Sequence, residues 1–409
     1  MQALGDEPRA AARSESALMV AAAGATALAV AMGIGRFAFT PILPMMQADA
    51  GLTLAAAGWL AAANYLGYLV GALCAARVPP AWALRGGLLL IALVTAGMGW
   101  ADGFAAWFVL RLVAGIASAW VLVHVSAWAL GRLLLLQRPQ ANGGVFAGVG
   151  IGIAGAGLLC MGLMHAQVDS ARAWEWFGLV SLLLTAAVWF AFGDAGQATA
   201  SGTRAEPSAS GALAEPSSRG TPAVHPQRMR WDADRWRLAL CYGAFGIGYI
   251  IPATFLPAMA KHYITDPAVF GWAWPVFGAA AALSTWAASR WLHAVNNRRL
   301  WAAAYLLMAL GVALPAVWPA LTAILIAALL VGGTFMVVTM AGLREARAVA
   351  GEQATGFIAA ITAVFAAGQV IGPLIVSALA RFQGGFALAL RAAAALLAVA
   401  AVALWRSAR

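Results

Sequence analysis

The stretch "GIGRFAFTPILPMM", Gly33 to Met46, places an arginine deep inside an apolar run that begins at Ala17. An apolar run of about 20 residues is long enough to cross a lipid bilayer as one helix. A charged side chain inside such a helix costs roughly 2.5–3.5 kcal/mol on insertion scales, so it usually faces a partner or a water-filled cavity. The stretch therefore predicts a membrane-spanning helix whose charged side chain faces a partner or a cavity.

The composition extends this prediction from one segment to the whole chain. Of 409 residues, 63% are hydrophobic and 10% are charged, and the mean hydropathy is +0.83. Soluble globular proteins are about 45–50% apolar and about 25% charged. So few charges cannot cover a soluble surface of this size, and we expect a polytopic protein embedded in a lipid bilayer.

Apolar segments separated by short polar turns indicate twelve spanning helices, six on each side of a long break. These segments cover residues 17–43, 53–76, 84–101, 104–130, 143–164, 173–193, 236–260, 268–290, 299–316, 319–343, 353–378 and 384–405. The break, residues 194–235, is charged and rich in Pro, Ser, Gly and Ala, which is typical of a flexible linker. We expect an all-α membrane protein with six-helix bundles over residues 1–195 and 235–409, joined by a cytoplasmic linker over 196–234.

The basic residues predict the orientation of these helices. The net charge is +10, and every basic residue except Lys261 is an arginine. With both termini inside, the outer loops hold only Arg172, Lys261 and Arg381, and most other arginines fall in the inner segments. This distribution is the positive-inside signal. We therefore expect an inner-membrane protein with both termini in the cytoplasm, and no nucleic-acid partner.

The opening stretch has a counterpart in the second half of the chain. "GIGRFAFTPILPMM" begins at residue 33 and "GIGYIIPATFLPAM" begins at residue 246, and the two agree at six of fourteen positions without a gap. Each lies in the first predicted helix of its half, and Tyr249 occupies the repeat position of Arg36. Two halves in the same orientation are typical of transporters built from parallel repeats.

Four stretches carry a resemblance to a known family: "GIGRFAFTPILP" and "AANYLGYLVGAL" in the first two helices, "RLVAGIASAW" in the fourth, and "AAGQVIGPLIVSAL" in the eleventh. With them the sequence resembles the major facilitator superfamily, and within it the YbfB/YjiJ-like branch. The resemblance implies two pseudo-symmetric six-helix bundles around a central substrate cavity. It also implies alternating access by rocking of the two halves.

The sequence departs from that superfamily at two places. The loop after the second helix usually has Gly, then Asp four residues later, then basic residues; here Gly71 and Arg77 are present but Ala75 replaces Asp. Arg77 stays a candidate for gating in an incomplete charge relay. The fourth helix of proton-coupled antiporters often carries Arg-x-x-Gln-Gly, and here Ala114 replaces Gln between Arg111 and Gly115.

Arg36 is the first candidate for substrate binding. Its planar guanidinium suits a carboxylate or a phosphate in a central cavity. The alternative is an arginine near the outer surface whose head reaches water. Pro44, near the helix end, is eight residues further, or about 12 Å at 1.5 Å per residue, so both readings stay open.

Two residues of the fourth helix are candidates for gating or proton coupling. Arg111 lies early in this helix and is otherwise an interfacial arginine. His124 lies deeper in "AWVLVHVSAW" and could titrate near neutral pH. The alternative for His124 is a buried neutral imidazole bonded to a carbonyl.

Other polar residues are expected to line the cavity. Asn64 and Tyr68 are four residues apart and share a helix face. This face either lines the cavity or bonds to a neighbouring helix. Tyr65 is expected near the rim of the cavity. Tyr242 and Tyr249 share a side of the seventh helix. The eleventh helix adds Gln369.

The sequence offers no catalytic or metal-binding pattern. The three cysteines and five histidines are scattered without ligand spacing, and no phosphate-binding loop follows a strand. We therefore expect a non-enzyme with no cofactor and no metal. Carboxylates near the helices, Glu175, Glu345 and Glu352, fall at segment ends, so proton coupling would rely on His124, one of these glutamates or the substrate itself.

These observations favour a monomeric secondary transporter for a small organic solute, with an organic anion as the expected substrate and protons as a candidate coupling ion. One alternative is efflux of drugs or sugars, in which aromatic and polar lining matters more than charge. A second alternative, from another class, is a non-transporting membrane sensor or scaffold. That alternative requires an effector domain, and the one long hydrophilic segment has the composition of a linker.

Overall fold

The computed structural model of the chain describes residues 16–138, 141–192, 231–263, 271–292, 295–351, 354–379 and 381–408. The secondary structure of these ranges is helical, with no strand among them. Most of the predicted linker, residues 196–230, lies outside the described residues, as do Glu352 and the predicted start of the eighth helix at 268–270.

The helices confirm the predicted order of twelve spanning segments. The first six are formed by α2 (Ala17–Leu28) with η1 (Ala29–Ile34) and α3 (Phe39–Asp49), α4 (Leu54–Cys74), η3 (Trp82–Gly86) with α5 (Gly87–Trp100), α6 (Phe104–Leu135), α7 (Asn142–His165), and α8 (Ser170–Val188) with η5 (Trp189–Phe192). The last six are α10 (Ala233–Tyr263), α12 (Ala273–Trp291), α13 (Asn297–Val317), α14 (Leu321–Ala350), α15 (Ala354–Leu379) and α16 (Gly385–Ser407). Among the described residues, eleven spans are long and apolar enough to cross a membrane, and α12 is the remaining long helix.

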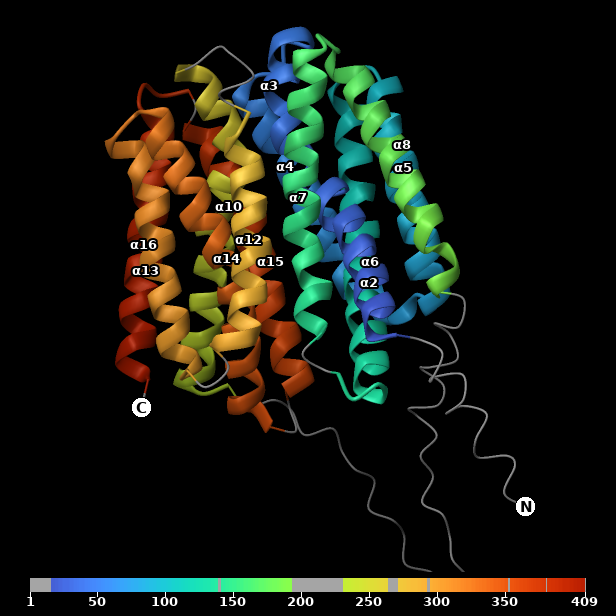
Figure 1. Ribbon diagram of the computed structural model, residues 1–409. Coiled ribbons are helices and arrows are strands. Elements are labelled where there is room, and N and C mark those ends of the chain that lie inside the picture. The colour runs from blue at the N-terminus through green and yellow to red at the C-terminus, as the bar shows by residue number, and fades with distance from the viewer. Residues whose placement is uncertain are drawn as a thin grey trace, which may run out of the picture.

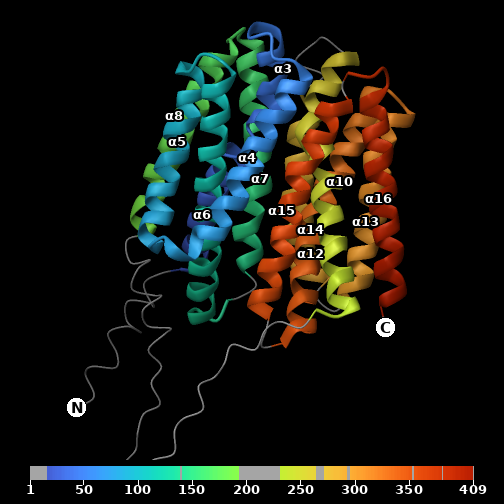
Figure 2. The ribbon, with the colours of Figure 1, turned by 180° about the vertical axis from the view of Figure 1, so that it is seen from behind.

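The helices form two bundles that stand side by side (Figure 1). The contact between them is made chiefly by α7 against α12 and by α4 against α15, and α10 also touches α3. The view from behind shows α4 and α15 next to each other (Figure 2). The start of α2 and the end of α16 lie at the same end of the bundles, as an even number of crossings requires.

The first helix is not continuous, and this corrects the prediction of one helix over 17–43. Between α2 and α3 the chain passes through the π-helical η1 and a turn, where Gly35 and Phe37 donate to carbonyls five residues back, at 2.8 and 3.1 Å. A Cβ on Gly33 would lie 2.5 Å from the backbone of Gly152, so η1 packs directly on the backbone of α7. The interruption puts Arg36 in the turn.

Glycines also let α4 and α6 pack backbone to backbone. A Cβ on Gly67 would lie 1.9 Å from the Leu112 carbonyl oxygen, and one on Gly115 would lie 2.0 Å from the Asn64 carbonyl oxygen. Small residues of this kind allow helices to approach closely within a membrane. The seam brings Asn64 and Arg111 together, beside the interrupted first helix.

A cluster of charges ties together four helix ends of the second bundle. Arg298 donates from both Nη atoms to the Asp234 carboxylate, at 2.8 and 2.6 Å, and from Nε to Glu345 at 2.5 Å. It also donates to the Ser407 carbonyl at 3.1 Å. These contacts join α10, α13, α14 and α16 through one guanidinium whose side chain is only 12% exposed.

Arg298→Ala is expected to lower the stability of the protein by about 2 kcal/mol, because it leaves two half-buried carboxylates without their shared cation. The matched control is Arg299→Ala. The Arg299 side chain is exposed and its backbone N–H alone bonds to the Asn296 cap, so a change within about 0.5 kcal/mol is expected. Thermal unfolding of both variants in detergent tests this. Equal loss in the two variants would contradict a role for the cluster.

Candidate functional site

Arg36 lies between the two bundles and is only 2% exposed. Its Nη2 donates to Oε1 of Gln369 on α15 at 2.6 Å. The guanidinium carbon lies 4.0 Å from the ring centroid of Tyr68 and 5.1 Å from that of Tyr65, distances at which a cation is attracted to an aromatic face. The Phe37 ring centroid lies 5.3 Å away, so the charge is held by one amide and three rings, away from the surface. A surface position for Arg36, the other reading of the sequence, does not fit this burial.

Gln369 connects the two repeat positions of the chain. Its Nε2 donates to the hydroxyl oxygen of Tyr249, while its Oε1 accepts from Arg36. Tyr249 occupies the place in α10 that Arg36 occupies in the first helix. Residues near a twofold axis meet their own equivalents. Here Arg36 and Tyr249, which occupy equivalent positions in the two halves, are bridged by Gln369 of α15.

A second repeat pair makes a direct contact. Thr40 donates from Oγ1 to the carbonyl of Ala253, its repeat equivalent, at 3.0 Å. Next to it, the hydroxyls of Tyr65 and Thr254 lie 3.1 Å apart. Further along α4 and α15, Ser377 donates to the carbonyl of Ala55 at 3.0 Å. These bonds join the bundles from Arg36 toward the end where α3 meets α4.

Arg111 and Asn64 hold the turn that carries Arg36. Arg111 donates from Nη2 to the Arg36 carbonyl at 3.1 Å and from Nη1 to the Gly35 carbonyl at 3.5 Å. Asn64 donates to the same Gly35 carbonyl at 3.3 Å and to the Arg111 carbonyl at 2.9 Å. The backbone N–H of Thr40 donates to the Phe37 carbonyl and not to the Arg36 carbonyl. The Arg36 carbonyl therefore accepts from the Arg111 guanidinium instead.

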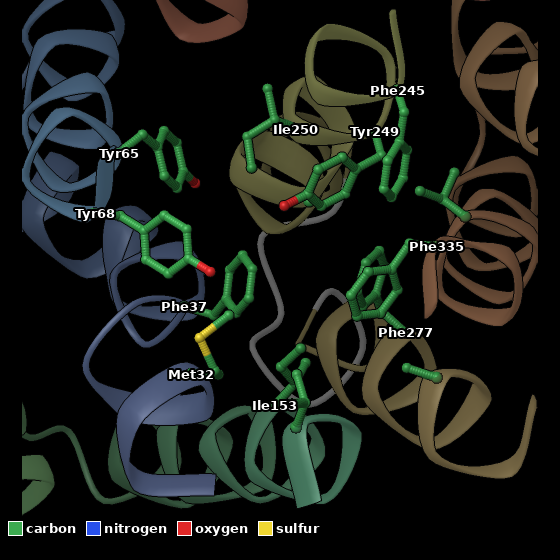
Figure 3. Close-up of a cluster of buried hydrophobic side chains, with 14 of the residues drawn as sticks. Met32, Phe37, Tyr65, Tyr68, Ile153, Phe245, Tyr249, Ile250, Phe277 and Phe335 are labelled. Atoms are coloured by element: carbon green, nitrogen blue, oxygen red, sulfur yellow. The ribbon is translucent and has the colours of Figure 1, made fainter. Parts of the chain in front are cut away.

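Aromatic rings surround the polar centre on both sides of the interface. Figure 3 shows Tyr65, Tyr68 and Phe37 facing Tyr249 of α10 across the interface, with the hydroxyls of Tyr68 and Tyr249 directed into the space between the bundles. Tyr249 stacks on Phe335 and on Phe365, each within 5° of parallel. Behind them, Phe277 stacks on both Phe335 and Trp274, and Trp274 contacts Phe37.

The charge of this site is not balanced by any acid in the described ranges. The described acids all lie in loops or near helix ends: Asp49, Asp102, Asp169, Glu175, Asp232, Asp234 and Glu345. Arg36 and Arg111 each keep a buried Nε without a hydrogen-bond partner. Two guanidinium groups therefore sit in the apolar interior with amide, carbonyl and aromatic partners, and the site carries positive charge.

Seven of the residues predicted from the sequence come together here: Arg36, Asn64, Tyr65, Tyr68, Arg111, Tyr249 and Gln369. Three others lie apart. The His124 ring bonds within its own helix to the Trp120 carbonyl at 2.9 Å, and Arg77 is exposed in the 3₁₀ turn that follows α4. Tyr242 lies about two helical turns before Tyr249 in α10. It packs edge-on against Trp301 in the same aromatic cluster.

The sequence prediction missed Thr40 and Thr254, which close the interface beside Arg36. The repeat contains the signal that would have found them, because Thr40 aligns with Ala253 and Thr254 follows directly. A threonine in an apolar helix carries little signal by itself, since its hydroxyl can bond back to its own helix.

Residues 28–405 match the family described as "Uncharacterised MFS-type transporter YbfB". No curated protein matches the chain.

Two solved structures share the fold. A bacterial homologue of the human lysosomal transporter Spinster, in an inward-facing and occupied conformation, has 14% sequence identity and a TM-score of 0.66, over 94% of this chain and 95% of that chain. The nucleoside transporter NupG, in a point-mutant form, has 11% identity and a TM-score of 0.67, over 95% of this chain and all of the other.

Proposed function

The chain belongs to the family of MFS-type transporters described for YbfB, and from this premise we propose that the solute it moves is a small organic anion. The family and the fold make it a membrane transporter and not an enzyme. The anionic character of the solute is inferred from the charge of the site between the bundles.

One observation carries this proposal: a buried guanidinium at the bundle interface has no carboxylate partner in the described part of the chain. Arg36 uses a neutral amide, Gln369, as its closest partner. Arginine and a carboxylate frequently form two parallel charge-assisted hydrogen bonds, whereas Gln369 offers Arg36 one neutral oxygen. A substrate carboxylate would therefore compete with the Gln369 oxygen for the Arg36 fork and would neutralise a charge that the fold leaves buried.

The position of Arg36 also links binding to movement of the bundles. Gln369 belongs to the second bundle, and its bond to Arg36 is one of the contacts that join the halves. An anion that replaces Gln369 removes this contact, so occupancy and the packing of the halves are coupled as alternating access requires. If transport is driven by protons, the substrate's own carboxyl group is the proposed proton carrier, because the described acids lie at helix ends.

We further propose that the protein acts as a monomer in the inner membrane, with both termini and the linker in the cytoplasm. The distribution of arginines along the chain supports this orientation. The described ends of α2 and α16 lie on one side of the bundles, as the proposal requires.

The test is uptake into vesicles that contain the purified full chain. Each organic acid of a panel is paired with its neutral amide, which has a similar shape and lacks the charge. We expect uptake of at least one acid above protein-free vesicles and no uptake of its amide. Equal uptake of an acid and its amide, or uptake of sugars or drugs alone, would contradict the proposal.

A further inference from the structure

We infer that the substrate of this site is a monocarboxylate with an aromatic or other apolar body and no cationic group. This inference rests on the proposed anion transport and names the substrate class of that same site. Three features of the site support it: the number of charges that the site can pair, the polar groups that are already hydrogen-bonded, and the aromatic rings around them.

The site has one guanidinium to offer to an anion. Arg36 donates to a single neutral oxygen, and its Nε is buried without a partner. Arg111 also has a buried Nε without a partner, but it directs both of its Nη atoms to the carbonyls of Gly35 and Arg36 and packs over the Phe39 ring. Freeing Arg111 would release the turn that positions Arg36. A second carboxylate on the substrate would therefore enter an apolar interior without a cation to pair with it, which is unfavourable.

The described part of the chain offers no carboxylate at this site to pair with a substrate ammonium. The described acids are at helix ends, and the polar groups around Arg36 are amides, hydroxyls and carbonyls. An ammonium placed next to the carboxylate of an amino acid would also lie near the Arg36 and Arg111 charges, which repel it. The charge pattern therefore selects against zwitterions.

Most of the hydroxyls and amides of the site are already bonded, and the Asn64 Oδ1 is the buried amide oxygen left without a partner, which disfavours sugars. Tyr65 pairs with Thr254, Gln369 pairs with both Arg36 and Tyr249, and Asn64 donates to two backbone carbonyls. A polyol needs many free partners, because each buried hydroxyl without one is destabilising.

The side chains next to these polar groups are aromatic. Tyr68 covers the Arg36 guanidinium from the first bundle, and Tyr249 stacks with Phe335 and Phe365 in the second. Figure 3 shows Tyr68 on one side of the interface and Tyr249 and Phe335 on the other. Flat rings favour offset-stacked or edge-to-face contact with another ring. A substrate with its carboxylate on Arg36 therefore places its body between Tyr68 and the Tyr249 stack.

The experiment compares five probes. They are 3-phenylpropanoate, propanoate without the ring, phenylalanine with an added ammonium, succinate with a second carboxylate, and 3-phenylpropanamide without the charge. Propanoate, phenylalanine and 3-phenylpropanamide each differ from 3-phenylpropanoate by one feature, and succinate differs by one feature from propanoate. Binding to the purified full chain is measured by the ligand-dependent shift in thermal unfolding, and uptake is measured in vesicles. We expect 3-phenylpropanoate to bind at least about tenfold more tightly than each of the others, a difference of about 1.4 kcal/mol.

Phe335→Ala tests the aromatic wall, with Phe190→Ala as its control. Phe335 is 5% exposed and stacks on Tyr249, whereas Phe190 is 86% exposed at the end of the sixth helix. Phe335→Ala is expected to reduce the advantage of 3-phenylpropanoate over propanoate by about fivefold or more through lost ring burial, and Phe190→Ala to leave it unchanged. If Phe335→Ala does not fold, the probe series on the natural chain decides alone.

The outcomes separate this inference from the proposed function. If succinate, propanoate or phenylalanine binds as tightly as 3-phenylpropanoate and the amide does not, anion transport stands and the substrate class is wrong. If 3-phenylpropanamide binds as tightly as the acid, both the substrate class and the proposed function are overturned. If no acid binds or moves, both are likewise overturned.

Discussion

Replacing Arg36 with methionine is expected to reduce transport of the anionic substrate by about thirtyfold or more. Methionine keeps an unbranched side chain of similar reach and removes the charge and the donor to Gln369. Truncating one partner of a buried, hydrogen-bonded charge pair costs about 2–5 kcal/mol, and each 1.4 kcal/mol is about tenfold in affinity. The loss should appear as weaker binding of every acid, with neutral compounds unaffected.

Two further variants identify the cause of that loss. Arg36→Lys keeps the charge and loses the planar fork, so partial transport with a raised KM is expected. Arg391→Met removes an arginine of α16 that is exposed and bonds to the Ala316 carbonyl, and it is expected to transport normally. Initial rates in vesicles, normalised to the amount of folded protein, give the comparison. Normal anion transport by folded Arg36→Met would contradict the role of this residue.

The site was largely predictable because it obeys simple rules of membrane helices. Charged and polar side chains inside an apolar helix turn toward a partner, and Arg36, Asn64, Tyr68 and Gln369 all do so. The repeat adds to this rule. Aligning the halves puts Tyr249 at the position of Arg36, and the two meet through Gln369.

The interruption of the first helix was not predictable from local sequence. Gly33, Gly35 and Pro41 around the turn weaken a helix, but spanning helices tolerate such residues, so they do not place the interruption. The π-helical segment depends on the close approach of Gly33 to α7 and on the Arg111 bonds to the turn, which are contacts between segments far apart in the sequence. Depth alone did not assign His124 either, because the sequence left both a titrating and a carbonyl-bonded imidazole open, and the structure gives it the Trp120 carbonyl of its own helix.

Arg111 shows how one residue type can take two roles in one site. Both Arg36 and Arg111 are buried, and the sequence favours gating, coupling or an interfacial position for the latter. The structure gives Arg111 two backbone carbonyls of the first helix as partners. We therefore expect it to position Arg36, and its effect on transport would follow from the turn that it holds.

Replacing Gly115 with alanine is expected to prevent normal packing of α4 on α6 and to leave little folded protein. The added Cβ would lie 2.0 Å from the Asn64 carbonyl oxygen and 2.8 Å from the Tyr68 backbone nitrogen. Backbone atoms cannot rotate away as a side chain can, so the helices must separate. Overpacking of a tight core costs about 1–3 kcal/mol and occasionally more, and here the displaced segment carries Asn64 and Tyr68 of the site.

The same helix supplies the control, because Gly131 of α6 has open space where its Cβ would be. Gly131→Ala changes the same kind of residue in the same helix, and alanine is the better helix former by about 0.8–1.0 kcal/mol in model helices. We expect Gly131→Ala to fold and unfold at an unchanged or higher temperature, and Gly115→Ala to elute as aggregate or to unfold well below the natural protein. Size-exclusion chromatography and thermal unfolding in detergent measure both. Equal behaviour of the two variants would mean that α4 can move away from α6 without loss, and that the contact of Asn64 with Arg111 does not depend on this glycine.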